Sequence, residues 1–100
     1  MNAVNRVAIT GAGVVSPVGH STQDYCAALK KGQSGIGPIT IPYAEELYQK
    51  VAAEVRDFDP AKHFDARQLA MMDRVSHFAV VAAREAIAQA GIDFGNGLSE

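Results

Sequence analysis

The chain has 100 residues, of which 48% are hydrophobic and 20% charged, with a formal net charge of −2. This composition is typical of a globular domain and excludes a disordered tail. The lack of a basic excess argues against nucleic acid or a membrane surface as partner, and the single cysteine cannot form an internal disulfide, which favours the cytoplasm.

The first predicted elements are a strand, a glycine-rich loop and a helix. The apolar run Val7–Thr10 predicts a strand buried on both faces, and residues 11–19 predict a loop. Ser21 or Thr22 can cap the helix that follows, and Gly32 suits its left-handed exit.

The middle of the chain predicts loops and short elements. Glycines and prolines indicate a loop over 33–42, which is followed by a short helix or turn over 43–50. Weak alternation predicts a strand over 51–55. Asp59 and Pro60 are typical of a helix start and predict a short turn through residue 64.

The longest predicted element is a helix over 66–90, capped by Asp65 and ended by Gly91. It would be about 37 Å long. Its residues 78–83 are apolar nearly all round, which predicts burial on several sides. Because so short a chain cannot easily surround this helix, we expect residues 1–100 to be the opening portion of a larger α/β domain, or a protomer that needs a partner.

The glycine loop after the first predicted strand suggests dinucleotide binding, in which glycines let the backbone approach a pyrophosphate. Three features oppose it. Ser16 stands at the third glycine position, Pro17 and Gly19 fall where the helix should already run, and no acidic residue occurs between Asp24 and Glu45. The alternative is that the glycines allow a tight strand exit against a crowded core.

Other chemistry in the chain is sparse. Cys26 has only Asp24 nearby, whose negative charge does not activate a thiol, so a buried structural cysteine is favoured. His20, His63 and His77 have no metal-ligand spacing. Since no nucleophile, base and oxyanion site come together, we predict no catalytic, cofactor-binding or metal-binding residue within 1–100.

The ordered series of segments nevertheless resembles one family. Residues 6–19, RVAITGAGVVSPVG, are similar to the opening of the β-ketoacyl-acyl carrier protein synthases, the elongating condensing enzymes of type II fatty acid synthesis. Gln33–Ile36, Phe58–Pro60, Met72–Arg74 and the alanine-rich helix that ends at Ile92 follow in register. The resemblance covers about residues 6–92.

The resemblance implies a thiolase-like layered α/β fold, of which this chain is the opening part of the first half, and usually a homodimer. It implies decarboxylative condensation of an acyl thioester with malonyl carrier protein, without a cofactor or metal. The family's nucleophilic cysteine and two histidines lie beyond this span, and Cys26 does not match the nucleophile. The 100 residues alone are expected to be inactive.

The resemblance also implies a docking segment for the acidic acyl carrier protein. Relatives often place several basic residues just before the Met-Asp pair; here Arg67 matches one of them, whereas Ala70 and Met71 replace others. Arg74 and Lys62 complete the candidate docking residues.

Two other functions stay open. The chain could belong to a specialised polyketide or aryl-polyene synthase, or to a chain-length-setting subunit without activity of its own. It could also be a non-enzymatic module that binds a partner through an exposed apolar helix.

Overall fold

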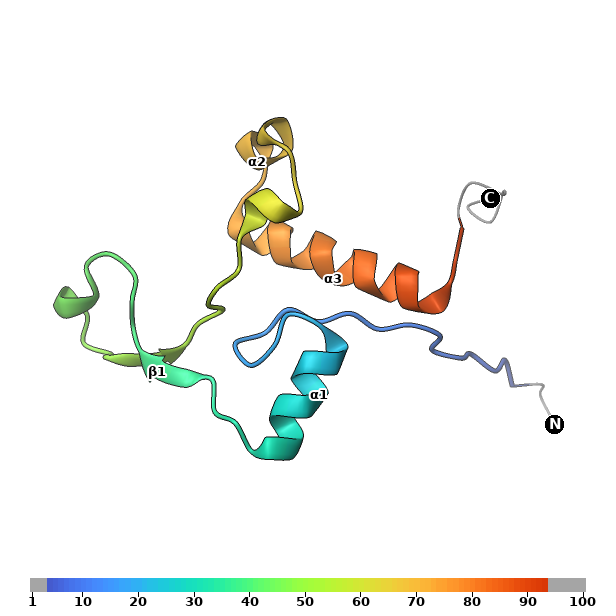
Figure 1. The fold of residues 1–100 in the computed structure, drawn as a ribbon, viewed down its shortest axis with the longest axis horizontal. Coiled ribbons are helices and arrows are strands. Elements are labelled where there is room, and N and C mark those ends of the chain that lie inside the picture. The colour runs from blue at the N-terminus through green and yellow to red at the C-terminus, as the bar shows by residue number, and fades with distance from the viewer. Residues whose placement is uncertain (1–3, 94–100) are drawn as a thin grey trace.

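The computed structural model describes residues 4–93. Helix α1 (Thr22–Lys31) is followed by the strands β1 (Ile36–Pro38) and β2 (Val51–Ala53), and later by the helices α2 (Ala66–Met71) and α3 (Arg74–Ala90). The 3-10 turns η1 (Ala44–Glu46) and η2 (Pro60–Lys62) lie between them. Figure 1 shows α3 and α1 on opposite sides of the extended N-terminal segment, with the β1–β2 hairpin standing away from both.

The chain does not close around a core of its own. Its radius of gyration is 17.9 Å, against about 13 Å for a compact domain of this length. Its accessible surface is 8002 Å², where a folded monomer of this mass exposes about 5,500 Å². The buried apolar side chains of the described residues are Ala28, Phe58 and Phe64. Most large apolar side chains of the described residues are therefore at least partly exposed.

The helix ends follow the local signals in the sequence. The Ser21 hydroxyl accepts the Asp24 backbone N–H at 3.2 Å, and α1 ends at Gly32 with φ of 68°. Asp59 caps η2, and Gly91 ends α3 in the same left-handed conformation. These predicted boundaries are confirmed, because each depends on hydrogen bonds within one turn.

The predicted strand over Val7–Thr10 is wrong for this structure. Val7 and Ile9 are each 90% exposed, and no strand pairs with this segment among residues 4–93. An extended segment becomes a strand only when a neighbour accepts and donates its backbone hydrogen bonds. The apolar pattern is present here without such a neighbour.

The prediction of loop throughout 33–42 is also wrong, because Ile36 to Pro38 pair with β2. The pairing is antiparallel, with Ile36 opposite Ala53 and Pro38 opposite Val51, which confirms three residues of the strand expected over 51–55. Arg56 Nη2 donates to the Pro38 carbonyl at 2.7 Å and supports the same edge.

The single helix expected over 66–90 is interrupted. Met72 is extended, with φ of −121° and ψ of 145°, and Asp73 starts a new helix by accepting the Ser76 backbone N–H at 2.9 Å. Asp65 and Gln68 form a capping box on α2, as the sequence indicates. The correction therefore concerns Asp73, which acts as a second N-cap within an otherwise continuous apolar pattern.

The apolar stretch over 78–83 is only partly covered. Phe78, Val80 and Val81 are half-buried, whereas Ala79 and Ala83 are exposed. No helix among residues 4–93 is long and apolar enough to cross a bilayer. Of the polar, glycine-rich tail over 93–100, residues 94–100 lie outside the described residues.

Candidate functional site

The glycine loop lies directly against the backbone of α3. A Cβ atom added at Gly13 would collide with the Ala82 carbonyl oxygen, and one added at Gly11 with the Ala86 carbonyl oxygen. The Ala12 backbone N–H donates to Gln89 Oε1 at 2.8 Å. The glycines thus serve a close approach between loop and helix, which is the alternative to a pyrophosphate site.

The start of α1 faces a carboxylate of the same chain. Glu85 on α3 accepts the backbone N–H groups of Val14 and Thr22, each at 2.9 Å, and the Thr22 hydroxyl at 3.3 Å. These hydrogen bonds, that from the Thr22 backbone first, lower the pKa of Glu85 against a smaller opposing effect of burial. Because this carboxylate occupies the positive end of the helix, the dinucleotide interpretation has no support from the geometry.

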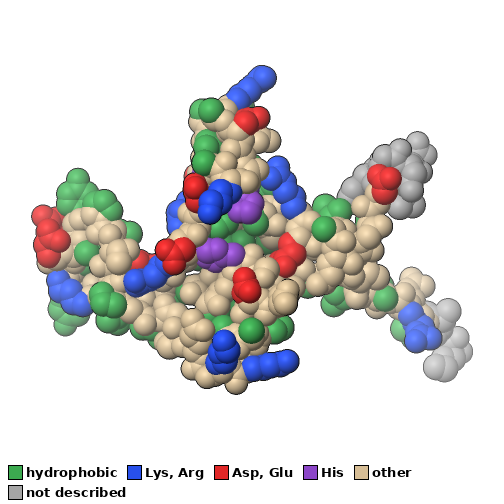
Figure 2. Space-filling view, in the orientation of Figure 1, with side chains coloured by type: hydrophobic (Ala, Val, Ile, Leu, Met, Phe, Trp, Pro, Cys, Tyr) green, Lys and Arg blue, Asp and Glu red, His purple; other side chains and the backbone are tan. Residues whose placement is uncertain are grey.

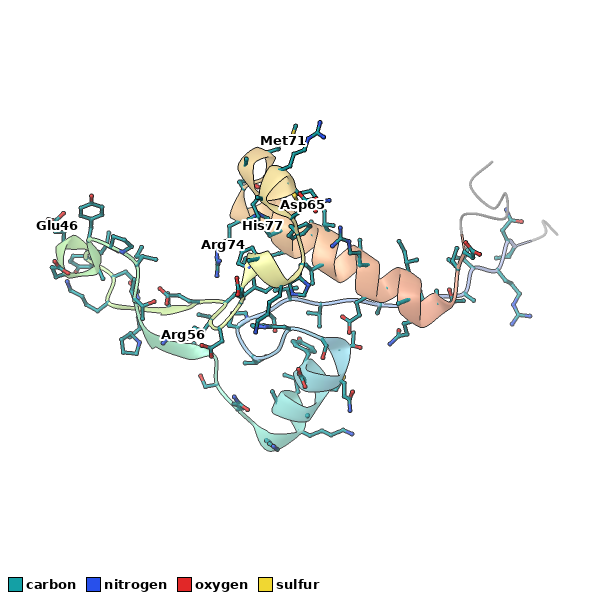
Figure 3. The ribbon with its side chains drawn as sticks, turned by 45° about the horizontal axis from the view of Figure 1, so that its top comes forward. Glu46, Arg56, Asp65, Met71, Arg74 and His77 are labelled. Carbon is teal, nitrogen blue, oxygen red and sulfur yellow. The ribbon has the colours of Figure 1, made fainter. Side chains whose placement is uncertain are left out.

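Two of the three candidate docking residues lie on neighbouring exposed elements. Arg67 is on α2 and Lys62 on η2, and these two elements pack against each other. Both side chains are exposed and form no ion pair with any residue of the range 4–93. Met71, at the end of the same helix, is 82% exposed (Figure 3), so α2 carries an exposed apolar side chain as well as the exposed Arg67.

Arg74 differs from these two because its guanidinium group is engaged within the fold. Its Nη2 donates to the Val55 carbonyl at 2.9 Å, and its Cζ lies 4.9 Å from the ring centroid of Phe78. It also lines a cleft of about 600 Å³ beside the hairpin. The structure thus ties Arg74 to the base of the hairpin.

Six aromatic side chains, of which Phe58, Phe64 and His77 are buried, form a group that we call the ring cluster. Phe58 stacks on His63 at 5.3 Å and meets Phe78 edge-on at 5.1 Å, while Phe64 lies 5.3 Å from His77. Figure 2 shows the histidines together near the centre of the molecule, next to basic side chains. The ring cluster consists of His20, Phe58, His63, Phe64, His77 and Phe78.

The remaining candidate side chains show no catalytic arrangement. Cys26 is exposed on α1, which corrects the expectation of a buried cysteine: Ala28 faces inward from the same helix instead. Within residues 4–93, no three His, Cys, Asp or Glu side chains gather closely enough to hold a metal ion. Sequence reasoning missed Glu85 and the buried His77, because both depend on contacts that no local motif encodes.

Comparison with known proteins identifies related sequences. Residues 4–97 match the family model described as beta-ketoacyl synthase, N-terminal domain. The 3-oxoacyl-[acyl-carrier-protein] synthase 2 of Coxiella burnetii is 44% identical over 88 residues, which is 88% of this chain and 21% of the relative. The Synechocystis protein of the same name is 43% identical over 82 residues, or 82% of this chain and 20% of the relative.

A third relative has a different name. The putative polyketide beta-ketoacyl synthase 1 of Streptomyces cyaneus is 43% identical over 91 residues, covering 90% of this chain and 21% of the relative. Among solved structures, "The ishigamide ketosynthase/chain length factor" superimposes with a TM-score of 0.71 at 36% identity, covering 88% of this chain and 22% of that one. The chain spans about a fifth of the length of the curated relatives it matches.

Proposed function

Because the chain belongs to the β-ketoacyl synthase family, with the thiolase-like fold of its N-terminal domain, we propose that the complete protein is a 3-oxoacyl-[acyl-carrier-protein] synthase. The observation that carries this proposal is the identity of 43–44% to two synthases of that name, over more than four-fifths of this chain. The proposed reaction extends an acyl chain by two carbons in fatty acid synthesis.

The proposed chemistry is a condensation in three steps. An acyl group passes from its carrier protein to a cysteine thiolate beyond residue 100, and the carrier thiol leaves. Malonyl carrier protein then loses carbon dioxide to give a carbanion, which attacks the enzyme-bound thioester. A carbon–carbon bond forms, the bond to the cysteine breaks, and two histidines beyond residue 100 stabilise the charged oxygens.

The residues of this chain take a supporting part in the proposal. Glu85 and the glycine loop hold α1 and the N-terminal segment against α3, which fixes the start of the domain. Arg67, Lys62 and Arg74 are the candidate docking residues for the acidic carrier protein, and the guanidinium of Arg74 is also bound to the Val55 carbonyl. We infer a cytoplasmic homodimer from the family resemblance.

A second candidate is a polyketide synthase, or a chain-length-setting subunit without activity of its own. Two findings support it: the identity of 43% to the Streptomyces cyaneus protein and the structural likeness to the ishigamide complex. The exposed Ala70 and Met71, at positions where relatives often have basic residues, add to it.

The experiment that separates these candidates is peptide mass spectrometry on the protein made from the complete gene. The protein is incubated with acyl carrier protein, then with malonyl carrier protein. An acyl adduct on a cysteine beyond Glu100, converted to an extended product, would support the synthase. No adduct on any cysteine would contradict it and favour the subunit without activity, while a product only with polyketide carrier proteins would favour the specialised pathway.

A further inference from the structure

Arg84, on α3, contacts the segment that links η2 to α2. Its Nη1 donates a hydrogen bond to the His63 carbonyl at 2.8 Å, across 21 positions of sequence. Its Cζ lies 4.8 Å from the ring centroid of Phe64, which is buried. One guanidinium group therefore binds two consecutive residues of the link, one through a hydrogen bond and one through a cation–π contact.

This link lies between two of the candidate docking residues. Lys62 is the last residue of η2 and directly precedes His63, and Arg67 is the second residue of α2. Figure 1 shows α2 above the first turns of α3. The placement of Lys62 relative to Arg67 therefore depends on the path of residues 63–65.

The two short elements on either side of the link are held by local hydrogen bonds. The Asp59 carboxylate accepts the Ala61 backbone N–H at 3.0 Å, which caps η2. At the start of α2, the Asp65 carboxylate accepts the Gln68 N–H at 2.8 Å, and the Gln68 side chain accepts the Asp65 N–H at 3.0 Å. These bonds fix each element internally. The contacts of Arg84, by contrast, attach the link to α3.

The two contacts of Arg84 depend on the shape of its side chain as well as on its charge. A guanidinium group is planar and can lie against a ring while its N–H groups donate to an oxygen nearby. A lysine ammonium is a compact, strongly hydrated charge on a flexible stem and has no such plane. Substitution of Arg84 by lysine therefore separates a role in holding the link from a role as a positive charge.

We propose that Arg84 is a positioning residue for docking of the acidic carrier protein. It attaches residues 63–65 to α3 and so holds Lys62 and Arg67 in one arrangement. The identity of the partner rests on the proposed function, whereas the attachment rests on the contacts given above. Two charges that are already held in place lose less conformational freedom when they meet a matching pair of acidic groups.

Titration calorimetry of the complete protein with acyl carrier protein at low ionic strength tests this through a double-mutant cycle. Arg84→Met removes the hydrogen bond and the charge, and should lower carrier affinity about three- to fivefold. In an Arg67→Ala background the same substitution should change affinity by less than about 1.5-fold, because there is no longer a pair of charges to hold in register. Effects that multiply independently would overturn the proposal.

Two further variants separate positioning from simple charge. Arg84→Lys keeps the positive charge without the planar group, and should lower affinity nearly as much as Arg84→Met. Lys31→Met removes a charge from an exposed position on α1 and should leave affinity within about twofold of the wild type. Wild-type affinity in Arg84→Lys would overturn the proposal, because the charge of residue 84 would then be sufficient.

Hydrogen exchange measured by mass spectrometry gives a readout that does not involve the carrier protein. Exchange in residues 61–68 should increase about three- to tenfold in Arg84→Met and Arg84→Lys, and should stay unchanged in α1. Unchanged exchange in 61–68 would overturn the attachment even if carrier affinity falls. A wild-type protein that binds no carrier protein would overturn both the proposed docking and this inference, whereas independent effects in a protein that does bind would overturn the inference alone.

Discussion

Glu85 Oε2 accepts the backbone N–H of Thr22 at 2.9 Å, which joins the middle of α3 to the first residue of α1 across 63 positions of sequence. The other oxygen of the same carboxylate accepts the Val14 N–H. One side chain thus satisfies a donor of the helix end and a donor of the loop. The helix dipole strengthens the arrangement, since it favours negative charge at this end.

Replacing this carboxylate by an amide should loosen the N-terminal part of the domain. In Glu85→Gln only one acceptor oxygen remains for two N–H donors, and the amide NH₂ would face the other donor. We expect the complete protein to lose about 1–2 kcal/mol of stability, measured as a lower denaturant midpoint. Exchange should also rise in residues 12–25.

The control for this variant is Glu46→Gln, which makes the same chemical change on the exposed turn η1. It should leave both the midpoint and the exchange of 12–25 unchanged. A Glu85→Gln protein that behaves like Glu46→Gln would show that the carboxylate is not what joins α1 to α3.

The same carboxylate predicts an acid dependence. Its pKa is lowered from the usual 4.5, chiefly by the Thr22 backbone hydrogen bond. A lowered folded-state pKa gives stability that is present above the ordinary value and is lost as the pH falls through the folded value. The stability difference between wild type and Glu85→Gln should therefore be constant above pH 5 and shrink below about pH 4.5, as denaturant midpoints at each pH would show. A difference that stays constant down to pH 3 would contradict this cause.

The local parts of this fold could be predicted from the sequence, while the parts that depend on distant contacts could not. Helix ends could be predicted at Ser21, Asp59 and Gly91, because a capping residue forms its hydrogen bond with a backbone group only a few residues away. Ile36 to Pro38 give no such signal, since their strand exists only through pairing with residues fifteen or so positions later. The N-cap role of Asp73 was not predicted, because the apolar pattern continues on both sides of this residue.

The candidate docking residues could likewise be predicted only in part from the sequence. The resemblance predicts a docking role for the basic segment around Arg67, whose side chain is exposed on α2. It also grouped Arg74 with Arg67, although the structure engages Arg74 with Val55 and two rings. Whether Arg67 or Arg74 is free to contact a partner depends on the fold of residues 55–58. The spacing of the arginines in the sequence does not predict that fold.

The close approach at Gly13 predicts a severe effect of a single methyl group. Gly13→Ala would drive a Cβ into the Ala82 carbonyl, and both are backbone positions that cannot rotate away. We expect a loss of about 3 kcal/mol or failure to accumulate as folded protein, measured by soluble yield and denaturant midpoint. Gly32→Ala is the control: it has open space but a φ of 68°, so it should cost only about 1 kcal/mol. Equal effects of the two variants would argue against the close approach.

Arg74→Ala should weaken the base of the hairpin. It removes the hydrogen bond to Val55 and the contact of the guanidinium with the Phe78 ring. Because the side chain is partly exposed, we expect a loss of about 1 kcal/mol, with faster exchange in residues 51–58. Arg74→Lys keeps the charge without the planar group and should restore little of this protection. If exchange in residues 51–58 of Arg74→Lys is as slow as in the wild type, Arg74 acts only through its positive charge.

Arg67 should contribute to binding of the acidic carrier protein in a way that depends on salt, if the proposed function holds. Its side chain is exposed on α2 and forms no ion pair within 4–93, so reversing its charge removes an attraction without disturbing the fold. We expect Arg67→Glu to lower carrier affinity about three- to tenfold at low ionic strength and less at high salt, because screening weakens exposed charges. Lys31→Glu makes the same change in net charge on α1 and should leave affinity within about twofold of wild type. Titration calorimetry of the complete protein at several salt concentrations measures both. If Arg67→Glu and Lys31→Glu bind the carrier protein with equal affinity at every salt concentration, Arg67 is not part of the docking surface. That result would leave the mass-spectrometric test of the condensing activity unaffected.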